Sequence, residues 1–85
     1  MAKFYLYCND NKGKCLKVDH IDVERDALAK FHQYRENTKK AHIALENAGL
    51  PTDCLAVSIV LETDGAFVDG WTLSRNSDGV LVENY

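Results

Sequence analysis

The sequence predicts a single α+β domain over residues 1–85, with one long helix packed on one face of an antiparallel sheet in the order ββαββ(β). Three observations predict this fold class. An apolar stripe with helical spacing runs through residues 23–48, alternating or aromatic segments stand on both sides of it, and short turn motifs separate those segments. A chain of this length can bury one such core.

The N-terminal segment is predicted to form a β-hairpin. Residues 3–8 are rich in aromatic side chains and residues 15–20 alternate, while the Asn, Asp and Gly residues of 9–13 favour a turn. The parity of this loop decides which residues of the first strand share a face with Leu16 and Val18 of the second. Two sets stay open: Tyr5 and Tyr7, or Phe4 and Leu6.

The central segment is predicted to form an amphipathic helix from about Val23 to Ala48. Its apolar residues recur at steps of three or four: Val23, Ala27, Phe31, Tyr34, Thr38, Ala41, Leu45 and Ala48. Asp22 is a candidate N-cap. At about 1.5 Å per residue the helix is longer than a typical strand. It therefore either overhangs the sheet or breaks near residues 37–38, and we expect one continuous helix.

The end of the helix is marked by three successive residues. Gly49 suits the left-handed position that follows a helix, Leu50 can contact the preceding turn, and Pro51 prevents continuation.

Two or three strands are predicted after the helix. Residues 55–63 alternate cleanly, and Asp64-Gly65 is a strong hairpin signal. In the next segment, 66–75, Phe67, Trp71 and Leu73 are in phase. Asp69-Gly70 in its middle indicates a β-bulge or, alternatively, a second turn. Residues 76–79 form another turn, and 80–84 a last strand.

The formal net charge of −3 is unevenly distributed along the chain. Residues 50–85 carry six acidic residues against a single cation, Arg75. Because phosphate contacts need cations, this part of the chain is a poor nucleic-acid surface. Its acidic turns could instead meet a basic protein patch.

No motif in the sequence carries recognisable catalytic or ligand chemistry. There is no glycine-rich phosphate loop. The pairs His32–Glu36 and His42–Glu46 are spaced like metal ligands, but we interpret both as a solvated polar face. We therefore expect no catalytic residue, no metal and no cofactor, and predict that the protein is not an enzyme. An enzyme or ligand-binding domain is the third hypothesis.

The three cysteines, Cys8, Cys15 and Cys54, fit a reducing compartment. We interpret Cys8 and Cys15 as small buried side chains, with a disulfide across the hairpin as the alternative. The N-terminus lacks a secretion signal, and no apolar stretch is long enough to span a membrane. We expect a cytoplasmic protein that has no membrane partner.

The first strand indicates a binding role. Residues 4–7 are consecutively apolar or aromatic, so this strand is apolar on both faces, whereas one helix covers a single face of the sheet. An uncovered apolar face usually binds a partner. The leading hypothesis is a small non-catalytic protein-binding domain that acts by occlusion or assembly, as an inhibitor, adaptor or regulatory subunit, and self-associates as a homodimer. Its size suits a phage or mobile-element protein.

The predicted protein-binding residues are Tyr5, Tyr7, Asp64, Asp69, Trp71 and Asp78. Trp71 is an interface anchor only if it is exposed, and otherwise belongs to the core. The alternative function is nucleic-acid binding through the helix cations Arg35, Lys39 and Lys40. We disfavour it because five acids dilute these cations on the same helix.

Overall fold

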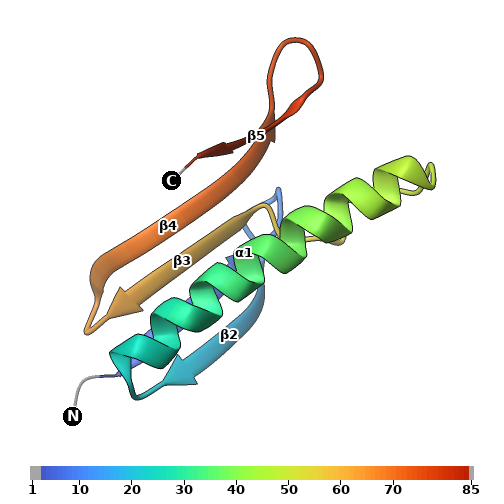
Figure 1. Cartoon of the computed structure of the whole chain (residues 1–85). Helices are drawn as coiled ribbons and strands as arrows, with labels where there is room; N and C mark the ends of the chain where they lie inside the picture. The colour runs from blue at the N-terminus through green and yellow to red at the C-terminus, as the bar shows by residue number, and fades with distance from the viewer. Residues whose placement is uncertain (1–2, 85) are drawn as a thin grey trace.

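Five antiparallel strands and one helix make up residues 3–84, the part of the chain that this computed structural model describes (Figure 1). The elements follow the predicted α+β order: β1 (Phe4–Asn9), β2 (Cys15–Ile21), α1 (Glu24–Asn47), β3 (Ser58–Thr63), β4 (Ala66–Arg75) and β5 (Leu81–Asn84).

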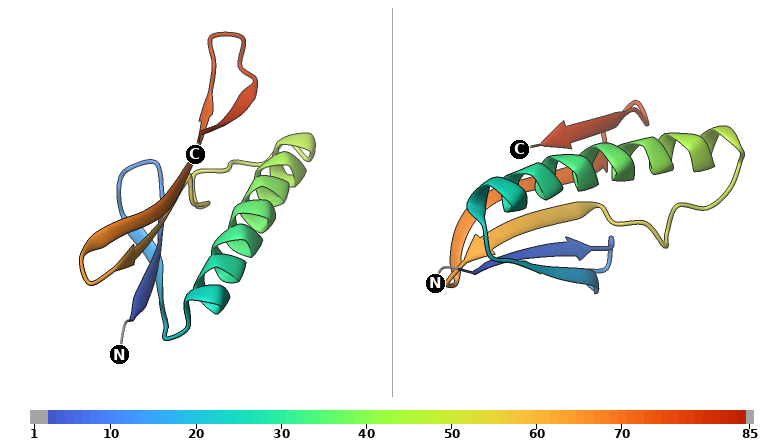
Figure 2. Two further views of the ribbon diagram at one scale, coloured as in Figure 1. Left: turned by 60° about the vertical axis from the view of Figure 1, so that its left-hand side comes forward. Right: turned by 60° about the horizontal axis from the view of Figure 1, so that its bottom comes forward.

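The sheet has the strand order β2-β1-β3-β4-β5. In chain order the β1–β2 hairpin comes first and α1 follows, packed on one side of the sheet. β3 then pairs with the edge of β1 that β2 leaves free. β1 therefore has a partner on both sides. Figure 2 shows the helix along one side of the sheet, while the other side has no covering element among the described residues.

The register resolves the open question of the first hairpin. Tyr7 lies opposite Val18 on β2 and opposite Val60 on β3. Tyr5 and Tyr7 therefore share the helix-free face with Val18, whereas Phe4 and Leu6 are buried beneath the helix. Side chains alternate between the two faces of a strand, so this register fixes the whole of β1.

The core lies between α1 and the sheet. It consists of eleven buried residues: Phe4, Leu6, Cys8, Ile21, Ala27, Phe31, Ala56, Ile59, Leu61, Trp71 and Leu73. Trp71 is only 1% exposed and donates its Nε1–H to Glu83 Oε1 at 3.0 Å. The core interpretation of Trp71 is the one the structure supports.

The helix is continuous and does not break at residues 37–38. Its C-terminal end projects past the strands in Figure 1. The predicted stop signal is confirmed. Gly49 has φ of 71° and donates to Glu46 O at 3.0 Å, while the N–H of Leu50 donates to Leu45 O at 2.8 Å. These two bonds form a Schellman motif, which satisfies carbonyls that the helix end leaves free.

The start of the helix differs from the prediction. Val23 occupies the N-cap position and no side chain caps the helix, so the prediction of Asp22 as N-cap is wrong. The helix begins one residue later than expected, which leaves Asp22 outside it. Glu24 and Asp26 in the first turn supply negative charge near the helix N-terminus instead.

A β-bulge interrupts the pairing of β3 with β4. Leu61 pairs with Asp69 and Glu62 with Phe67, so Val68 is an extra residue on β4. A bulge is present in this strand, but it lies at Val68 and not at the predicted Asp69-Gly70, and the alternative of a second turn is not observed. The extra residue shifts the alternation of β4, so the residues that precede it point to the opposite side of the sheet from the one that strict alternation gives. Phe67 therefore lies on the helix-free side, where it is 69% exposed. The prediction that Phe67 is in phase with Trp71 is therefore wrong.

The ends of the remaining elements follow local turn chemistry. β3 begins at Ser58 instead of residue 55, although Val57 already bonds to both neighbouring strands. Asp64 and Gly65 both have positive φ, as a two-residue hairpin turn requires.

Within residues 3–84, no helix combines the length and apolar character needed to cross a membrane.

Candidate functional site

The helix-free side of the sheet is the candidate site, and we call it the open face. Its outward-pointing residues on the five strands are Tyr5, Tyr7, Asn9, Val18, His20, Ser58, Val60, Glu62, Phe67, Gly70, Thr72, Ser74, Val82 and Asn84. The aliphatic and aromatic ones are concentrated on β1 and its two neighbours and at Phe67, whereas the rest of β4 and β5 is mainly polar on this face, and all keep part of their surface exposed. Glu62 is the acidic residue of this face.

Aromatic rings along β1 form the centre of the open face. The ring centroids of Tyr5 and Tyr7 are 6.4 Å apart with an interplanar angle of 23°. His20 packs edge-on against Tyr5, with the centroids 4.9 Å apart. These contacts leave the tyrosines half-buried at their sides while their outer surface faces solvent. Tyrosine in this setting offers apolar area with a polar tip, which suits protein interfaces.

A shallow hollow of about 230 Å³ lies on the same face over β3 and β4. It exists because Gly70 has no side chain, and Phe67 forms part of its wall. A Cβ atom on Gly70 would stand 3.0 Å from Cε1 of Phe67, so the Phe67 ring occupies part of the space above the glycine. The hollow can accept a side chain from outside.

The predicted binding residues do not form one site. Tyr5 and Tyr7 lie together on the open face. Asp64 and Asp78 are exposed in the turns at opposite ends of β4, a strand of ten residues that spans about 30 Å. Asp69 lies at the bulge, where its Oδ1 accepts the Gly70 N–H at 2.8 Å. Trp71 points into the core and is absent from the surface.

The helix cations do not all share one surface: Arg35 and Lys39 both lie near Glu83, whereas Lys40 does not. Lys39 Nζ lies 3.0 Å from Glu83 Oε2, and Arg35 Nε lies 3.9 Å from Glu36 Oε1. Hydrogen bonds from Lys39 and then from Trp71 hold the pKa of Glu83 below its usual range. Lys40 is on the exposed side of the helix.

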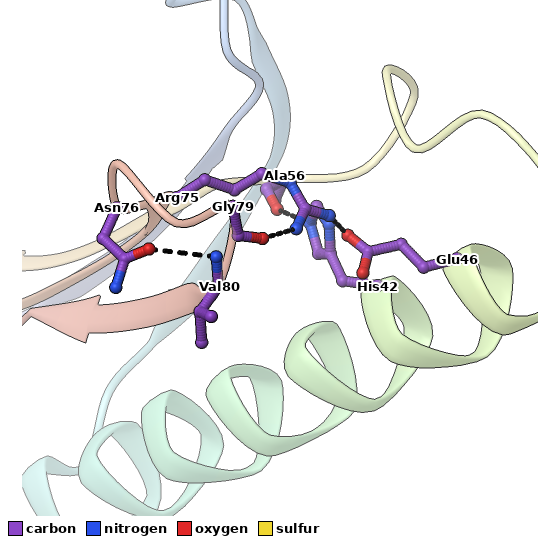
Figure 3. Close-up of polar contacts among 7 residues, drawn as sticks. All are labelled: His42, Glu46, Ala56, Arg75, Asn76, Gly79 and Val80. Atoms are coloured by element: carbon purple, nitrogen blue, oxygen red, sulfur yellow. Dashed lines mark hydrogen bonds and ion pairs between the residues drawn. The ribbon is translucent and has the colours of Figure 1, made fainter.

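Burial of His42 was missed by the sequence analysis. His42 is 4% exposed, and its Nε2 lies 2.8 Å from Ala56 O (Figure 3). Glu46 is ion-paired with Arg75, whose Nη1 donates to Gly79 O at 2.6 Å. The interpretation of His42–Glu46 as a solvated polar face is therefore wrong. The signal was present, because His42 continues the helical spacing of the buried stripe four residues after Thr38.

The other candidate groups show little convergence. His32 and Glu36 are both exposed, as predicted for a solvated pair. Cys8, Cys15 and Cys54 are free thiols, so the alternative of a Cys8–Cys15 disulfide is not formed. Cys15 is exposed, which contradicts its interpretation as a buried side chain. Burial, and then the charge of Asp19, raises the pKa of Cys8. Across residues 3–84, no three side chains of metal-ligating type gather at one point.

A second polar cluster joins the helix to β2. The Tyr34 hydroxyl donates to Asp19 Oδ2, and Lys17 Nζ lies 4.8 Å from the centroid of the Tyr34 ring. These contacts cover the edge of the core. They lie on the helix side of the sheet and are separate from the open face.

Comparisons with known proteins add no relative: no family model, curated protein or solved structure matches this chain.

Proposed function

We propose that this protein is a small non-catalytic protein-binding domain that docks a protein partner on the open face. The observation that carries the proposal is the contrast between the two sides of the sheet. One side is sealed by α1, whereas the other presents aromatic and aliphatic side chains to solvent. Contiguous exposed apolar surface of this kind marks interaction sites.

Phe67 illustrates the energy available to a partner. Complete burial of a phenylalanine side chain stabilises a complex by about 1.5–3 kcal/mol. Phe67 keeps 69% of its surface exposed, so about 1–2 kcal/mol of this stabilisation is still available. The adjoining hollow over Gly70 can receive a side chain, and filled pockets of this type contribute strongly to binding.

The proposed mechanism is occlusion or assembly. A rigid sheet face covers part of a partner's surface, in the manner of an inhibitor, adaptor or regulatory subunit. The open face carries little charge, so the contact is expected to depend weakly on salt. We place this role in the cytoplasm, where the exposed thiols of Cys15 and Cys54 stay reduced. The small size fits a phage or mobile-element origin.

Chemical cross-linking in cells that express the protein, followed by affinity capture, tests the proposal, because a cross-link retains a weakly bound partner as well as a tightly bound one. The wild type is compared with Tyr7→Glu and Val18→Glu on the open face, and with Ile43→Glu on the helix. Ile43 is a matched control because it is 42% exposed and apolar but lies far from the open face. Thermal unfolding establishes that each variant folds.

We expect the wild type and Ile43→Glu to form a cross-link to one protein, either a second copy or another chain, and the two open-face variants to lose it. A carboxylate introduced into an apolar contact would be buried without a partner, which is costly. Recovery of the same protein by all four forms, or of none by the wild type, would contradict the proposal.

A further inference from the structure

We propose that the occupant of the open face is a second copy of this chain, packed sheet on sheet about a two-fold axis parallel to β1. This inference rests on the proposed function, because it names the partner of that same face. It is carried by the arrangement of side chains across β2, β1 and β3.

Two rows of side chains cross these three strands. The first row is His20, Tyr5 and Glu62, and the second is Val18, Tyr7 and Val60. Neighbouring strands are about 4.8 Å apart, so in each row the two outer residues stand at equal distances from β1. In each row the tyrosine is therefore at the centre, with one outer residue on either side at the same distance.

A two-fold axis along β1 uses this arrangement. It places β2 of one copy over β3 of the other. Each residue keeps its position along the strand direction, so residues of the same row in the two copies face each other. His20 of one copy then faces Glu62 of the other, and Val18 faces Val60. The symmetry repeats both contacts on the opposite side of the axis, as in any isologous interface.

The facing groups are complementary in hydrogen bonding and polarity. An imidazole N–H donates to a carboxylate, so the one acidic residue of the open face gains a hydrogen-bonding partner twice in the dimer. The valines meet each other and the tyrosines stack near the axis. Aligned sheets pack about 10 Å apart, and an axis along β1 keeps the strands of the two copies aligned.

Other axes fit the open face less well. An axis along β3 brings Glu62 against its own copy, and like charges in contact are strongly unfavourable. An axis across the strands, between the two rows, sets Glu62 against Val60 and leaves the carboxylate unpaired. The pattern therefore favours the axis along β1.

The contact area predicts a weak dimer. Three strands at about 4.8 Å spacing and six residues at about 3.3 Å each give a footprint of about 14 by 20 Å, or about 300 Å². A standard interface buries about 800 Å² on each partner. A contact this much smaller than the standard size is expected to be weak and transient, so the equilibrium must be followed over a wide range of concentrations. Phe67 and the Gly70 hollow stay at the rim.

Analytical ultracentrifugation of the full chain, from about 10 µM to about 1 mM, tests the inference. We expect a reversible monomer–dimer equilibrium for the wild type. His20→Glu places a carboxylate against Glu62 and raises the dissociation constant by about tenfold or more. Glu62→Lys also weakens the dimer. Gln33→Glu, an exposed helix change with the same added charge as His20→Glu, leaves the equilibrium unchanged.

An equimolar mixture of His20→Glu and Glu62→Lys gives the decisive comparison. In the mixed dimer one contact joins the introduced carboxylate to the introduced ammonium, and the other is the native contact between His20 and Glu62. The mixture should therefore dimerise more tightly than either variant alone. No gain on mixing would overturn the two-fold arrangement.

The outcomes separate this inference from the proposed function. A wild type that stays monomeric at every concentration overturns self-association. If Tyr7→Glu nevertheless loses a captured protein of different identity, the proposed function stands and only the second copy is excluded. A dimer that is insensitive to both His20→Glu and Tyr7→Glu uses another surface and contradicts the inference.

Discussion

At the residue scale, His42 ties the helix to the segment that leads into β3. Its imidazole is buried and bonded to Ala56 O, and Ala56 is itself buried. A buried carbonyl that loses its partner retains the full cost of its desolvation. This contact therefore contributes more to stability than an exposed histidine on the same helix does.

We expect His42→Ala to lower the free energy of unfolding by about 2–3 kcal/mol, through the unpaired Ala56 carbonyl and the cavity left by the ring. Urea denaturation measures this change. His32→Ala is the control on the same helix, because His32 is exposed, and it should shift stability by about 0.5 kcal/mol or less. Equal losses in the two variants would show that His42 has no special role.

The free energy of unfolding is expected to depend on the ionisation of Glu83 at low pH. Its pKa is lowered in the folded protein by hydrogen bonds from Lys39 and Trp71. A lowered pKa stabilises the fold above the unfolded pKa of glutamate, about 4.3, and this contribution is lost as pH falls through the folded pKa. Wild type should exceed Glu83→Gln in unfolding free energy at pH 7.

The difference between wild type and Glu83→Gln should shrink as the pH is lowered from about 5 to about 2. Chemical denaturation across this range measures it. Glu36→Gln serves as the control, because Glu36 is half-exposed on the surface and weakly paired with Arg35. A difference for Glu83→Gln that stays constant with pH would contradict the role assigned to its carboxylate.

The residue scale also shows where sequence reasoning reached its limit. The side of the sheet taken by Tyr5 and Tyr7 depends on loop parity, which no local preference determines. His42 was assigned to solvent on its residue type, although its helical position matched the buried stripe. Its partner, Ala56, lies on a different segment, and such a contact becomes visible only when the chain is folded.

At the element scale, the C-terminal end of α1 follows from local chemistry. Gly49 adopts a positive φ, and the next two residues complete the stop signal. All the groups involved lie within a few residues of one another, so the sequence predicted this end correctly. The N-terminal end has no comparable side-chain cap, and its position was predicted less well.

Gly49→Ala tests this helix end. No atom lies within 4 Å of a Cβ built on Gly49, so the change acts through the backbone alone. We expect a loss of about 1 kcal/mol in the free energy of unfolding, because alanine disfavours a positive φ. Gly49→Asn should cost less, since asparagine tolerates the left-handed region. Circular dichroism during urea titration gives both values, and no loss for alanine would contradict the assignment.

The bulge in β4 explains a larger error of sequence reasoning. A strand with strict alternation would place Phe67 on the core side with Trp71, as the sequence analysis predicted. Asp69-Gly70 indicated a bulge in this strand, but both residues pair regularly with β3. The exact location of the bulge depends on the pairing with β3, where Val68 is the extra residue. One inserted residue moves Phe67 to the open face and thereby adds to the candidate site.

At the scale of the whole molecule, a single helix on a five-stranded sheet leaves one side uncovered. The α+β order and the single helix followed from local patterns of the sequence, which left the number of strands after the helix at two or three. The strand order did not, because it depends on β3 returning to the edge of β1. That return creates the tyrosine rows on which the proposed interface depends.

Nucleic-acid binding is the competing function at this scale. Its predicted cations are divided, because Arg35 and Lys39 lie near the carboxylate of Glu83 and Lys40 is on the exposed side of the helix. We therefore expect no retardation of labelled DNA or RNA in a mobility-shift assay at low salt. Binding that weakens steeply as salt is raised, and that Lys40→Glu reduces, would support this alternative.

Hydroxyl-radical footprinting compares the protein free at low concentration with the protein in its saturated complex, whether the partner is the captured protein or a second copy. The side chains of Tyr5 and Tyr7 should be oxidised much more slowly in the complex, while Ile43 on the helix stays as reactive as before. Unchanged oxidation of both tyrosines, with protection confined to the helix, would show that the open face is not where this protein binds.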